Sequence, residues 1–541
     1  MKGRSPAFMQ LPLDIVGSTT FGRYPKISQS QTFNMIISDG FLVPYAGHLQ
    51  VAAVSPQADG RGIFTSVRLN SVVAVIGNMA YLMSSDLEVT QIGTLATFSG
   101  TVYIEENLNG QIVISDQQNL YVYNWQTPSN PALVTITAAT LGFTPGYITM
   151  QNNRIIAAAV GTNSWMLSAV GDATSWPGTA AFVGALQTKP DYVQAVQRFP
   201  GRGNLLAVMG STVMEPWQDI GAALFPYLKN SSVNVDYGCL SPATVAWNEN
   251  YVVWLAANEK SGPFIAYSTG GDIKRISTDG IDFRFTTLTN ASNSYGFLFR
   301  QDGHLIYQIT FPDDQLTYAY DFNTDKFFTI TNEDQNAHIA KRVTFFNNTY
   351  YFVSFVDGNI YEMSTKYSTY NGAEIPRIRI CKNIRMPDAS RFAINNLTFT
   401  LESGTQAQVI EEDDLQTDKG EIIMTDDGQD IVANYPFTYI GPIPLMTDSG
   451  LNLMTDAGQN LEANVLLDQP YIVPQSVGLS VSKDGGQNFG SVKIKDLFPQ
   501  GNTRNRLIYW QLGAANDFVP MFQFWGLSRF VATDGIASVY Q

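Results

Sequence analysis

The histidines and cysteines of this chain are too few and too scattered for most active sites. The three histidines, His48, His304 and His338, stand far apart in strand-like or loop contexts. No Gly-x-Ser-x-Gly elbow and no His-Glu-x-x-His motif occurs, so the sequence predicts neither a serine nor a zinc hydrolase. Cys239 and Cys381 are the only cysteines, and we expect two buried free thiols, with a single bridge as the open alternative.

A glycosidase is the remaining enzymatic candidate. The segment Ser482-x-Asp484-x-Gly486-x-Asn488-Phe489 nearly fits the Asp-box pattern of sialidase propellers. In such a turn the Ser and Asp side chains bind loop amides, so the pattern predicts a hairpin and not a reaction. Glycoside hydrolysis needs two carboxylates at a set separation, which no sequence pattern locates. No phosphate-binding Gly-x-x-x-x-Gly-Lys loop is present either, and we predict no enzyme and no cofactor.

Most of the net charge lies in one block. Between Leu401 and Pro470 the chain has fourteen acidic residues and one basic residue, Lys419, so this block supplies −13 of the net −15. A Met-Thr-Asp-x-Gly phrase starts at Met424, Met446 and Met454, and Asp-x-Gly between apolar residues predicts stacked hairpins. A calcium loop needs more closely spaced carboxylates, so we predict no metal and propose an anionic collar. Its residues are Glu411, Glu412, Asp413, Asp414, Asp426, Asp427 and Asp456.

The elements around these residues are predicted to be strands. Short β-branched or aromatic runs bounded by Asn, Asp and Gly recur along the chain, while helical periodicity is scarce. Tyr81 and Tyr121 open similar strands 40 residues apart, a spacing that suits one four-stranded propeller blade. We therefore predict an all-β chain with a β-propeller of about six or seven blades. A pair of β-sandwiches is the alternative.

The predicted domains follow from changes in this pattern. Residues 1–44 are expected to form an N-terminal arm, and residues 45–375 the propeller. Alternating strands in 376–404 and 471–541 predict a β-sandwich-like domain, interrupted by the acidic hairpin insertion 405–470.

The sequence argues against secretion, membrane insertion and tight nucleic-acid binding. The opening residues lack the apolar run of a signal peptide, and apolar stretches are strand-sized, so no membrane insertion is expected. Basic residues are not clustered enough to grip phosphates. Any DNA near the protein is therefore expected to pass and not to be held.

Several phrases in a fixed order resemble the packaged-DNA-stabilising tail proteins of podoviruses. Met209-Gly-Ser-Thr-Val-Met-Glu215-Pro-Trp217-Gln-Asp-Ile-Gly221 follows Pro190-Asp191. Downstream come Leu240-Ser-Pro and Arg275-Ile-Ser-Thr, and later Ser482 to Phe489 and Arg506 to Gly513. The resemblance covers roughly residues 60–400 and 477–525, and it departs mainly in the acidic block.

This resemblance implies a structural role in the virion. It implies a tail nozzle or hub, made in the bacterial cytoplasm, that forms a ring, similar to a hexameric one, below the portal and its adaptor. Such a ring retains the packaged genome, conducts double-stranded DNA at ejection, and contacts tail fibres or tailspikes. Trp217, Arg275, Asp484 and Trp510 are then expected to be structural anchors. A receptor-binding or glycan-cleaving tail protein and a structural head protein are the alternatives.

Overall fold

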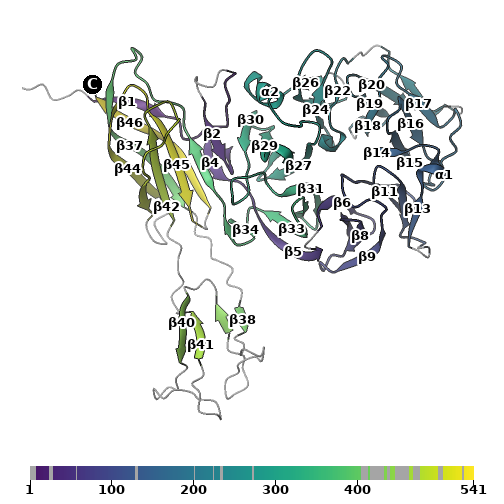
Figure 1. Ribbon diagram of the computed structural model, residues 1–541, viewed down its shortest axis with the longest axis horizontal. Helices are drawn as coiled ribbons and strands as arrows, with labels where there is room; N and C mark the ends of the chain where they lie inside the picture. Colours follow the sequence, from purple (N-terminus) through teal and green to yellow (C-terminus); the bar gives the residue numbers. More distant parts are fainter. Residues whose placement is uncertain are drawn as a thin grey trace, which may run out of the picture.

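The computed structural model describes most of the chain as β-structure (Figure 1). The described residues are 8–23, 29–55, 58–127, 129, 132–199, 201–222, 225–231, 235–270, 273–403, 475–497, 504–526 and 529–540, together with four short strands between 412 and 466. Within them the α-helices are α1 (Ala138–Leu141) and α2 (Asp279–Thr286). No helix in this part of the chain is long and apolar enough to cross a membrane.

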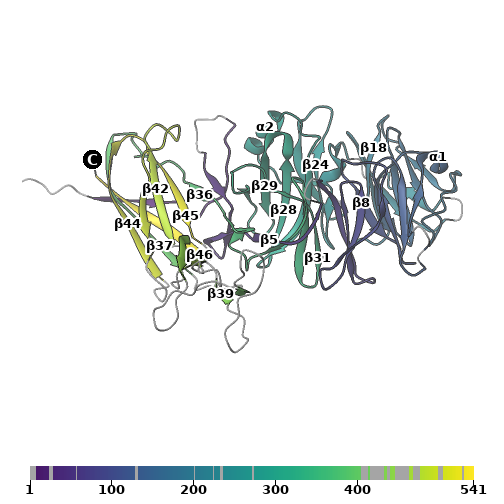
Figure 2. The same cartoon turned by 60° about the horizontal axis from the view of Figure 1, so that its bottom comes forward.

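Seven antiparallel sheets, each built on four strands, form the blades of a propeller (Figure 1). Figure 2 shows the propeller beside a smaller β-sandwich. Blade 1 comprises β6 (Gly60–Ser66), β7 (Ser71–Ile76), β8 (Met79–Met83) and β9 (Val89–Thr94), and blade 2 comprises β10 (Tyr103–Glu106), β11 (Gln111–Ser115), β12 (Leu120–Asn124) and β13 (Leu133–Ile136). Blade 3 comprises β14 (Pro145–Gln151), β15 (Arg154–Ala159), β16 (Ser164–Leu167) and β17 (Val183–Ala185), and blade 4 comprises β18 (Val193–Arg198), β19 (Leu205–Gly210), β20 (Met214–Asp219) and β21 (Tyr227–Lys229).

The remaining blades follow in chain order. Blade 5 comprises β22 (Gly238–Cys239), β24 (Val252–Ala257), β25 (Phe264–Ser268) and β26 (Ile273–Arg275), with β23 (Ala246–Trp247) beside β24. Blade 6 comprises β27 (Tyr295–Gln301), β28 (His304–Phe311), β29 (Leu316–Asp321) and β30 (Lys326–Thr329), and blade 7 contains β31 (Ala340–Phe346), β32 (Thr349–Ser354) and β33 (Gly358–Ser364). Tyr81 and Tyr121 lie in the third strands of blades 1 and 2, which confirms the meaning of their 40-residue spacing.

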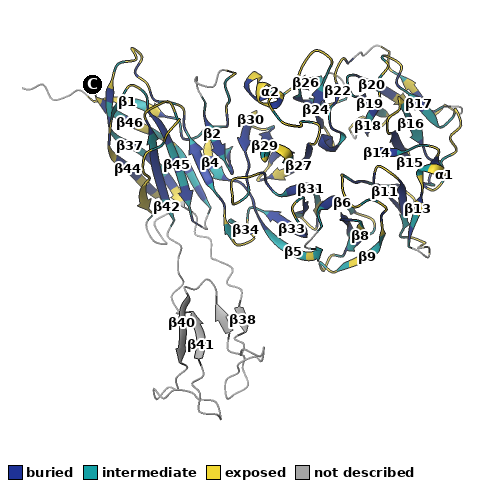
Figure 3. Cartoon of the chain, viewed as in Figure 1, coloured by how far each residue is buried: buried dark blue, intermediate teal, exposed yellow. Residues whose placement is uncertain are grey.

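Local sequence explains the blades. Residues Val72 to Ile76 in β7 are buried on both faces, because neighbouring blades pack face to face (Figure 3). The turn after β14 places Asn152 and Asn153 at φ 49° and 60°, a left-handed pair that asparagine tolerates and that a two-residue hairpin requires.

A strand from far upstream closes the ring. The fourth strand of blade 7 is β5 (Gly47–Ser55), which pairs antiparallel with β33 from Gly47 opposite Ser364 to Ser55 opposite Gly358. Short strands β34 (Thr369–Tyr370) and β35 (Ala373–Glu374) extend this sheet. The residues that close the propeller are thus about 300 positions apart in the chain.

The second domain is a two-sheet sandwich. One sheet has the order β3 (Met35–Ser38), β4 (Phe41–Pro44), β46 (Phe530–Tyr540), β37 (Phe392–Ser403) and β44 (Arg504–Ala515), with β1 (Met9–Leu13) also paired to β46. The other has the order β2 (Gln31–Phe33), β36 (Arg377–Ile380), β45 (Val519–Trp525), β42 (Ser476–Ser482) and β43 (Lys493–Asp496). The fold class predicted from the sequence is confirmed.

The N-terminal segment belongs to this sandwich. Residues predicted to form an arm supply β1 to β4, and Leu13 and Met35 are buried in the same core as Phe522. β2 also pairs in parallel with β30, so the second sheet continues from blade 6 into the sandwich. The two domains therefore share one nine-stranded sheet.

The acidic insertion is described only as paired backbone. β38 (Glu412–Asp414) pairs with β39 (Val432–Asn434), and β40 (Tyr439–Pro444) pairs with β41 (Glu462–Leu466). Glu411, Asp426, Asp427 and Asp456 lie outside the described residues. The anionic collar stays a prediction.

Candidate functional site

The phrase around Glu215 and Trp217 forms a hydrogen-bonded lock between blades 3 and 4. Glu215 in β20 is buried, and its Oε1 accepts hydrogen bonds from the backbone N of Gln187 at 2.8 Å and of Thr188 at 2.5 Å. The Thr188 hydroxyl also donates to Oε1 at 2.6 Å. Residues 187 and 188 belong to the link from β17 to β18, so this carboxylate fixes the path between the blades.

Nearby charge, hydrogen bonds and burial determine the protonation state of the Glu215 carboxyl. The Lys229 Nζ lies 3.2 Å from Glu215 Oε1 and also donates to the Thr188 hydroxyl at 2.6 Å. Burial alone would raise the pKa of Glu215, but the hydrogen bonds from Thr188 and Gln187, together with Lys229, hold that pKa below its ordinary value. Glu215 is thus an ionised carboxylate with its oxygens occupied by protein donors.

Asp191 completes the lock from the other direction. It lies at the end of the same link, and its Oδ1 accepts from the Ser211 hydroxyl at 2.6 Å. Its Oδ2 accepts from the Thr212 backbone N at 2.8 Å. Asp191 of the β17–β18 link therefore fixes the turn between β19 and β20, and Glu215 of β20 fixes the same link. Both segments stand out in the sequence, but their reciprocal contact is visible only in the fold.

Trp217 is buried between Glu215 and Trp165. Its side chain is 3% exposed, its Nε1 donates to Glu215 Oε2 at 3.1 Å, and its ring meets that of Trp165 edge-on at 5.5 Å. Buried aromatic pairs of this kind stabilise the blade core beyond the area they bury.

Arg275 and Asp484 stabilise local turns. Arg275 is half-exposed and forms ion pairs with Asp279, at 2.9 Å, and with Asp282 at the start of α2. Asp484 Oδ1 accepts from the Ser482 hydroxyl at 2.6 Å and from two backbone N–H groups, at Gln487 and Asn488. The hydrogen bond from Ser482, followed by those from Asn488, holds the pKa of Asp484 well below its ordinary value. The turn therefore has the predicted Asp-box form.

Trp510 does not anchor the core. Its side chain is 53% exposed, whereas its neighbour Tyr509 is buried. Because side chains alternate along β44, Trp510 lies on the outer face of the sandwich, opposite Asn396 of β37.

His304 joins the two domains through a triad of side chains. Its Nδ1 lies 2.9 Å from Asp321 Oδ2, and its Nε2 lies 3.1 Å from the hydroxyl of Ser38 at the end of β3. The atoms are those of a Ser-His-Asp relay. Ser38 belongs to the sandwich, whereas His304 and Asp321 belong to blade 6, so we interpret the triad as a tie between blade 6 and the sandwich.

His48 and His338 are buried together in the closing blade. Their ring centroids are 5.7 Å apart, and His48 stacks on Tyr370 at 4.6 Å. Burial, and then the neighbouring His338, lowers the pKa of His48 to about 2, while burial lowers that of His338 to about 3. Both rings are thus neutral.

Both cysteine thiols are inaccessible to solvent. Cys239 and Cys381 are free and buried, as predicted, and burial raises the pKa of the Cys381 thiol to about 12.

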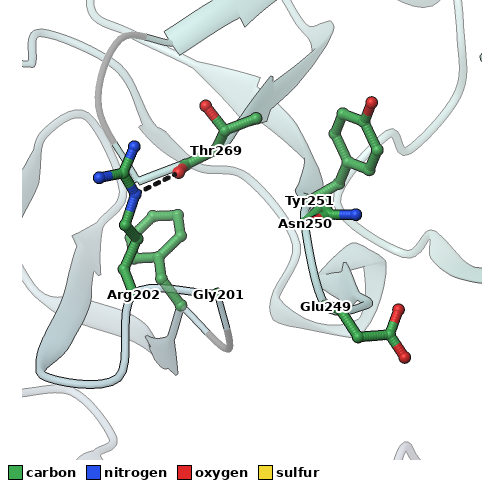
Figure 4. A pocket seen from close by; sticks show the side chains of 7 residues that line it. Gly201, Arg202, Glu249, Asn250, Tyr251 and Thr269 are labelled. Carbon is green, nitrogen blue, oxygen red and sulfur yellow. Dashed lines mark hydrogen bonds between the residues drawn. The ribbon is translucent and has the colours of Figure 1, made fainter.

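A pocket of about 320 Å³ opens between the turns of blades 4 and 5. Figure 4 shows Arg202 on one side, with its Nε donating to the Thr269 carbonyl at 3.4 Å, and Glu249 on the other. Glu249 is the single carboxylate among its lining residues. Among the described residues, this pocket therefore lacks the pair of carboxylates that glycoside hydrolysis requires.

One family model matches more than half of the chain. The phage-stabilisation family model described as Bacteriophage P22 Gp10, beta-propeller, matches residues 10–368. No curated protein matches the chain. Similar solved structures include a catalytically inactive virginiamycin B lyase from Staphylococcus aureus with quinupristin, at 13% identity and TM-score 0.41, covering 59% of this chain and 98% of that one. Another is the Neurospora crassa Pan2 WD40 domain, at 8% identity and TM-score 0.36, covering 60% of this chain and 96% of that one.

Proposed function

This chain belongs to the phage-stabilisation family of the P22 Gp10 β-propeller, and from that premise we propose that it forms a nozzle ring below the portal of a short phage tail. As a member it is a structural bacteriophage tail protein of the virion. In the proposed role, several copies, six by the resemblance, close the DNA exit channel and hold the packaged genome. The adaptor protein would bind above, and tail fibres or tailspikes alongside.

The single observation that carries this proposal is the rigid union of a closed propeller with a sandwich through one continuous sheet. A nozzle must resist the pressure of packaged DNA without changing shape. Pairing of β5 with β33 joins the first and last parts of the propeller by backbone hydrogen bonds, so opening the ring requires breaking a strand pair.

The charge of the chain supports passage of DNA and not its capture. Residues 45–375, with 26 acidic and 16 basic residues, and the acidic insertion both repel phosphates. We propose that the acidic insertion 405–470 adds an anionic collar near the exit. A solvated outer knob is the competing placement.

The collar is tested by a quadruple substitution in the phage. Glu411→Gln, Glu412→Gln, Asp413→Asn and Asp414→Asn together remove four charges. If the block lines the channel, DNA ejection should slow, and more so at low salt, because screening hides the charges at high salt. Equal ejection kinetics at all salt concentrations, in particles that assemble normally, would contradict the collar.

The nozzle itself is tested by copy number and by DNA retention. Quantitative imaging of virions should find this chain as one ring below the portal. Particles lacking it should package DNA and then lose it. A copy number of three or five, or full retention without the protein, would contradict the proposal.

A further inference from the structure

The two domains carry opposite charge. Residues 45–375 contain 26 Asp and Glu against 16 Lys and Arg, whereas 376–403 and 471–541 contain 11 Lys and Arg against six Asp and Glu. The propeller is thus anionic and the sandwich cationic. Opposite charge on separate bodies of one chain favours contact between copies.

The cationic charge of the sandwich gathers at its open edge. β43 and β44 are the last strands of their two sheets, and the Lys493 Nζ reaches the carbonyl oxygens of Trp510 at 3.1 Å and Gln511 at 3.3 Å. The two strands therefore lie side by side. Lys493, Lys495, Arg504 and Arg506 are exposed there, Arg504 with 75% of its side chain accessible beside Glu402.

Apolar side chains accompany these charges. Ile494 is 61% exposed, Trp510 is 53% exposed and Val492 is 41% exposed. We call the surface formed by residues 492–496 and 504–510 the cationic edge. Tryptophan and arginine are residue types enriched at the centres of protein interfaces.

The complementary surface lies on one side of the propeller. In an antiparallel blade, the turn between the second and third strands emerges on the same side as the link to the next blade. On that side of blades 4 to 7 lie eight acidic residues that we call the acidic rim: Asp236, Glu259, Asp279, Asp313, Asp314, Glu333, Asp334 and Asp357. Lys189, Lys260, Arg275 and Arg284 share this side. Lys189 pairs with Asp236 at 3.1 Å, and Arg275 pairs with Asp279 at 2.9 Å, so the rim keeps an excess of acidic residues.

Contacts confirm that links and turns meet on this side. Asn293, in the link into blade 6, donates to Asp313 at 2.8 Å, and Thr289 in the same link donates through its backbone N to Asp314. Glu333 and Asp334 are exposed in the next link. The link into blade 6 and the turn of that blade therefore lie together on this side.

We propose that the cationic edge of one copy docks on the acidic rim of a second copy. Figures 1 and 2 place β44 at the end of the molecule far from the propeller, so the edge cannot reach the rim of its own chain. A contact between two different surfaces is head-to-tail, which is the kind that closes into rings. The inference rests on the proposed nozzle ring and identifies the surfaces that would build it.

Two full-length variants test the pairing. One carries Arg504→Glu and Arg506→Glu, and the other carries Glu333→Lys and Asp334→Lys. Self-association is measured by sedimentation velocity at low salt and again at 0.3 M salt. Wild-type protein should associate at low salt, and each variant alone should associate at least tenfold more weakly, because its two surfaces then carry like charge.

The mixture is the decisive sample. In an equimolar mixture every contact between unlike copies again joins opposite charges, so association should return to within a few fold of wild type. Circular dichroism of each variant, matching that of wild type, confirms folding.

Other outcomes would overturn the inference. If both variants associate as wild type does, the edge and rim are not the interface, and the ring stands on other surfaces. If wild type stays monomeric at low salt, the inference fails, and copy number in the virion still tests the nozzle. If the mixture stays dissociated while a 30-base-pair duplex binds wild type but not the arginine variant, the cationic edge is a DNA surface instead.

Discussion

Replacing Glu215 with alanine should release the link between blades 3 and 4. The carboxylate accepts two backbone N–H groups, a hydroxyl and an indole N–H, and it neutralises Lys229. Each donor left without an acceptor in a buried site costs about 1–3 kcal/mol. Gln187 and Thr188 are exposed residues, so water can replace part of what their N–H groups lose. We therefore expect a loss of about 3 kcal/mol, and about half of that for Glu215→Gln, which keeps an acceptor oxygen.

Hydrogen exchange measures this loss where it occurs. The amides of Gln187 and Thr188 should exchange on the order of 100-fold faster in Glu215→Ala, since about 1.4 kcal/mol corresponds to a tenfold change. Amides of the distant blade 7 should be unaffected. Glu259→Ala, which removes an exposed carboxylate from a turn of blade 5, serves as the matched control.

The reasoning also predicts a pH dependence. The pKa of Glu215 is lowered in the folded state, so its contribution is present above the pKa of an unfolded glutamate and is lost as the pH falls through the folded value. Glu215→Ala should therefore lose part of the acid sensitivity of the wild type. Exchange at residues 187 and 188 within threefold of wild type would refute the lock.

Three further predictions concern other buried polar groups. The pKa of His48 is lowered to about 2 in the folded state, so its contribution to stability is present above pH 6.5 and falls as the pH drops. In His48→Phe, the free energy of unfolding should depend less steeply on pH between pH 6.5 and 4, by about 1.4 kcal/mol per pH unit. Urea denaturation at several pH values measures this difference. Arg379→Lys should lower the free energy of unfolding by about 2–4 kcal/mol. The fully buried guanidinium donates to three carbonyl oxygens of the N-terminal segment, which a single ammonium group cannot reach together. Limited proteolysis should then cleave that segment faster. A fluorophosphonate serine probe should not label Ser38, since the triad with His304 is a structural tie, and labelling abolished by Ser38→Ala would show a reactive serine instead.

Much of the propeller follows from sequence because its rules are local. The spacing of Tyr81 and Tyr121 repeats because each occupies the third strand of its blade. The closure of the ring by β5 does not follow, because a strand pattern says nothing about a partner 300 residues away. The parallel contact of Phe33 with Thr329 is hidden for the same reason.

The site residues divide in the same way. Asp484 was predictable, because its turn depends on hydrogen bonds within five residues. The prediction that Trp510 is an anchor relied on its residue type and not on the face of its strand. Side chains alternate along β44, so the pattern that buries Leu507 and Tyr509 exposes Trp510. The role of Glu215 depends on a link 27 residues away, so only the folded geometry reveals it.

Closure by an early strand delays the folding of a nascent chain. β5 leaves the ribosome long before β33, and at about 5–20 residues per second roughly 300 residues separate them by some 15–60 s. During that interval the edges of β5 and of the first blades stay unpaired, and β1 and β4 wait even longer for β46. Unpaired edges in a crowded cytosol favour aggregation, so the yield of native protein should depend on translation rate and on chaperones that shield nascent strands. Synonymous codons that slow translation between β5 and β33 should therefore lower the soluble yield of this chain more than that of a protein whose sheets pair only with their neighbours in sequence.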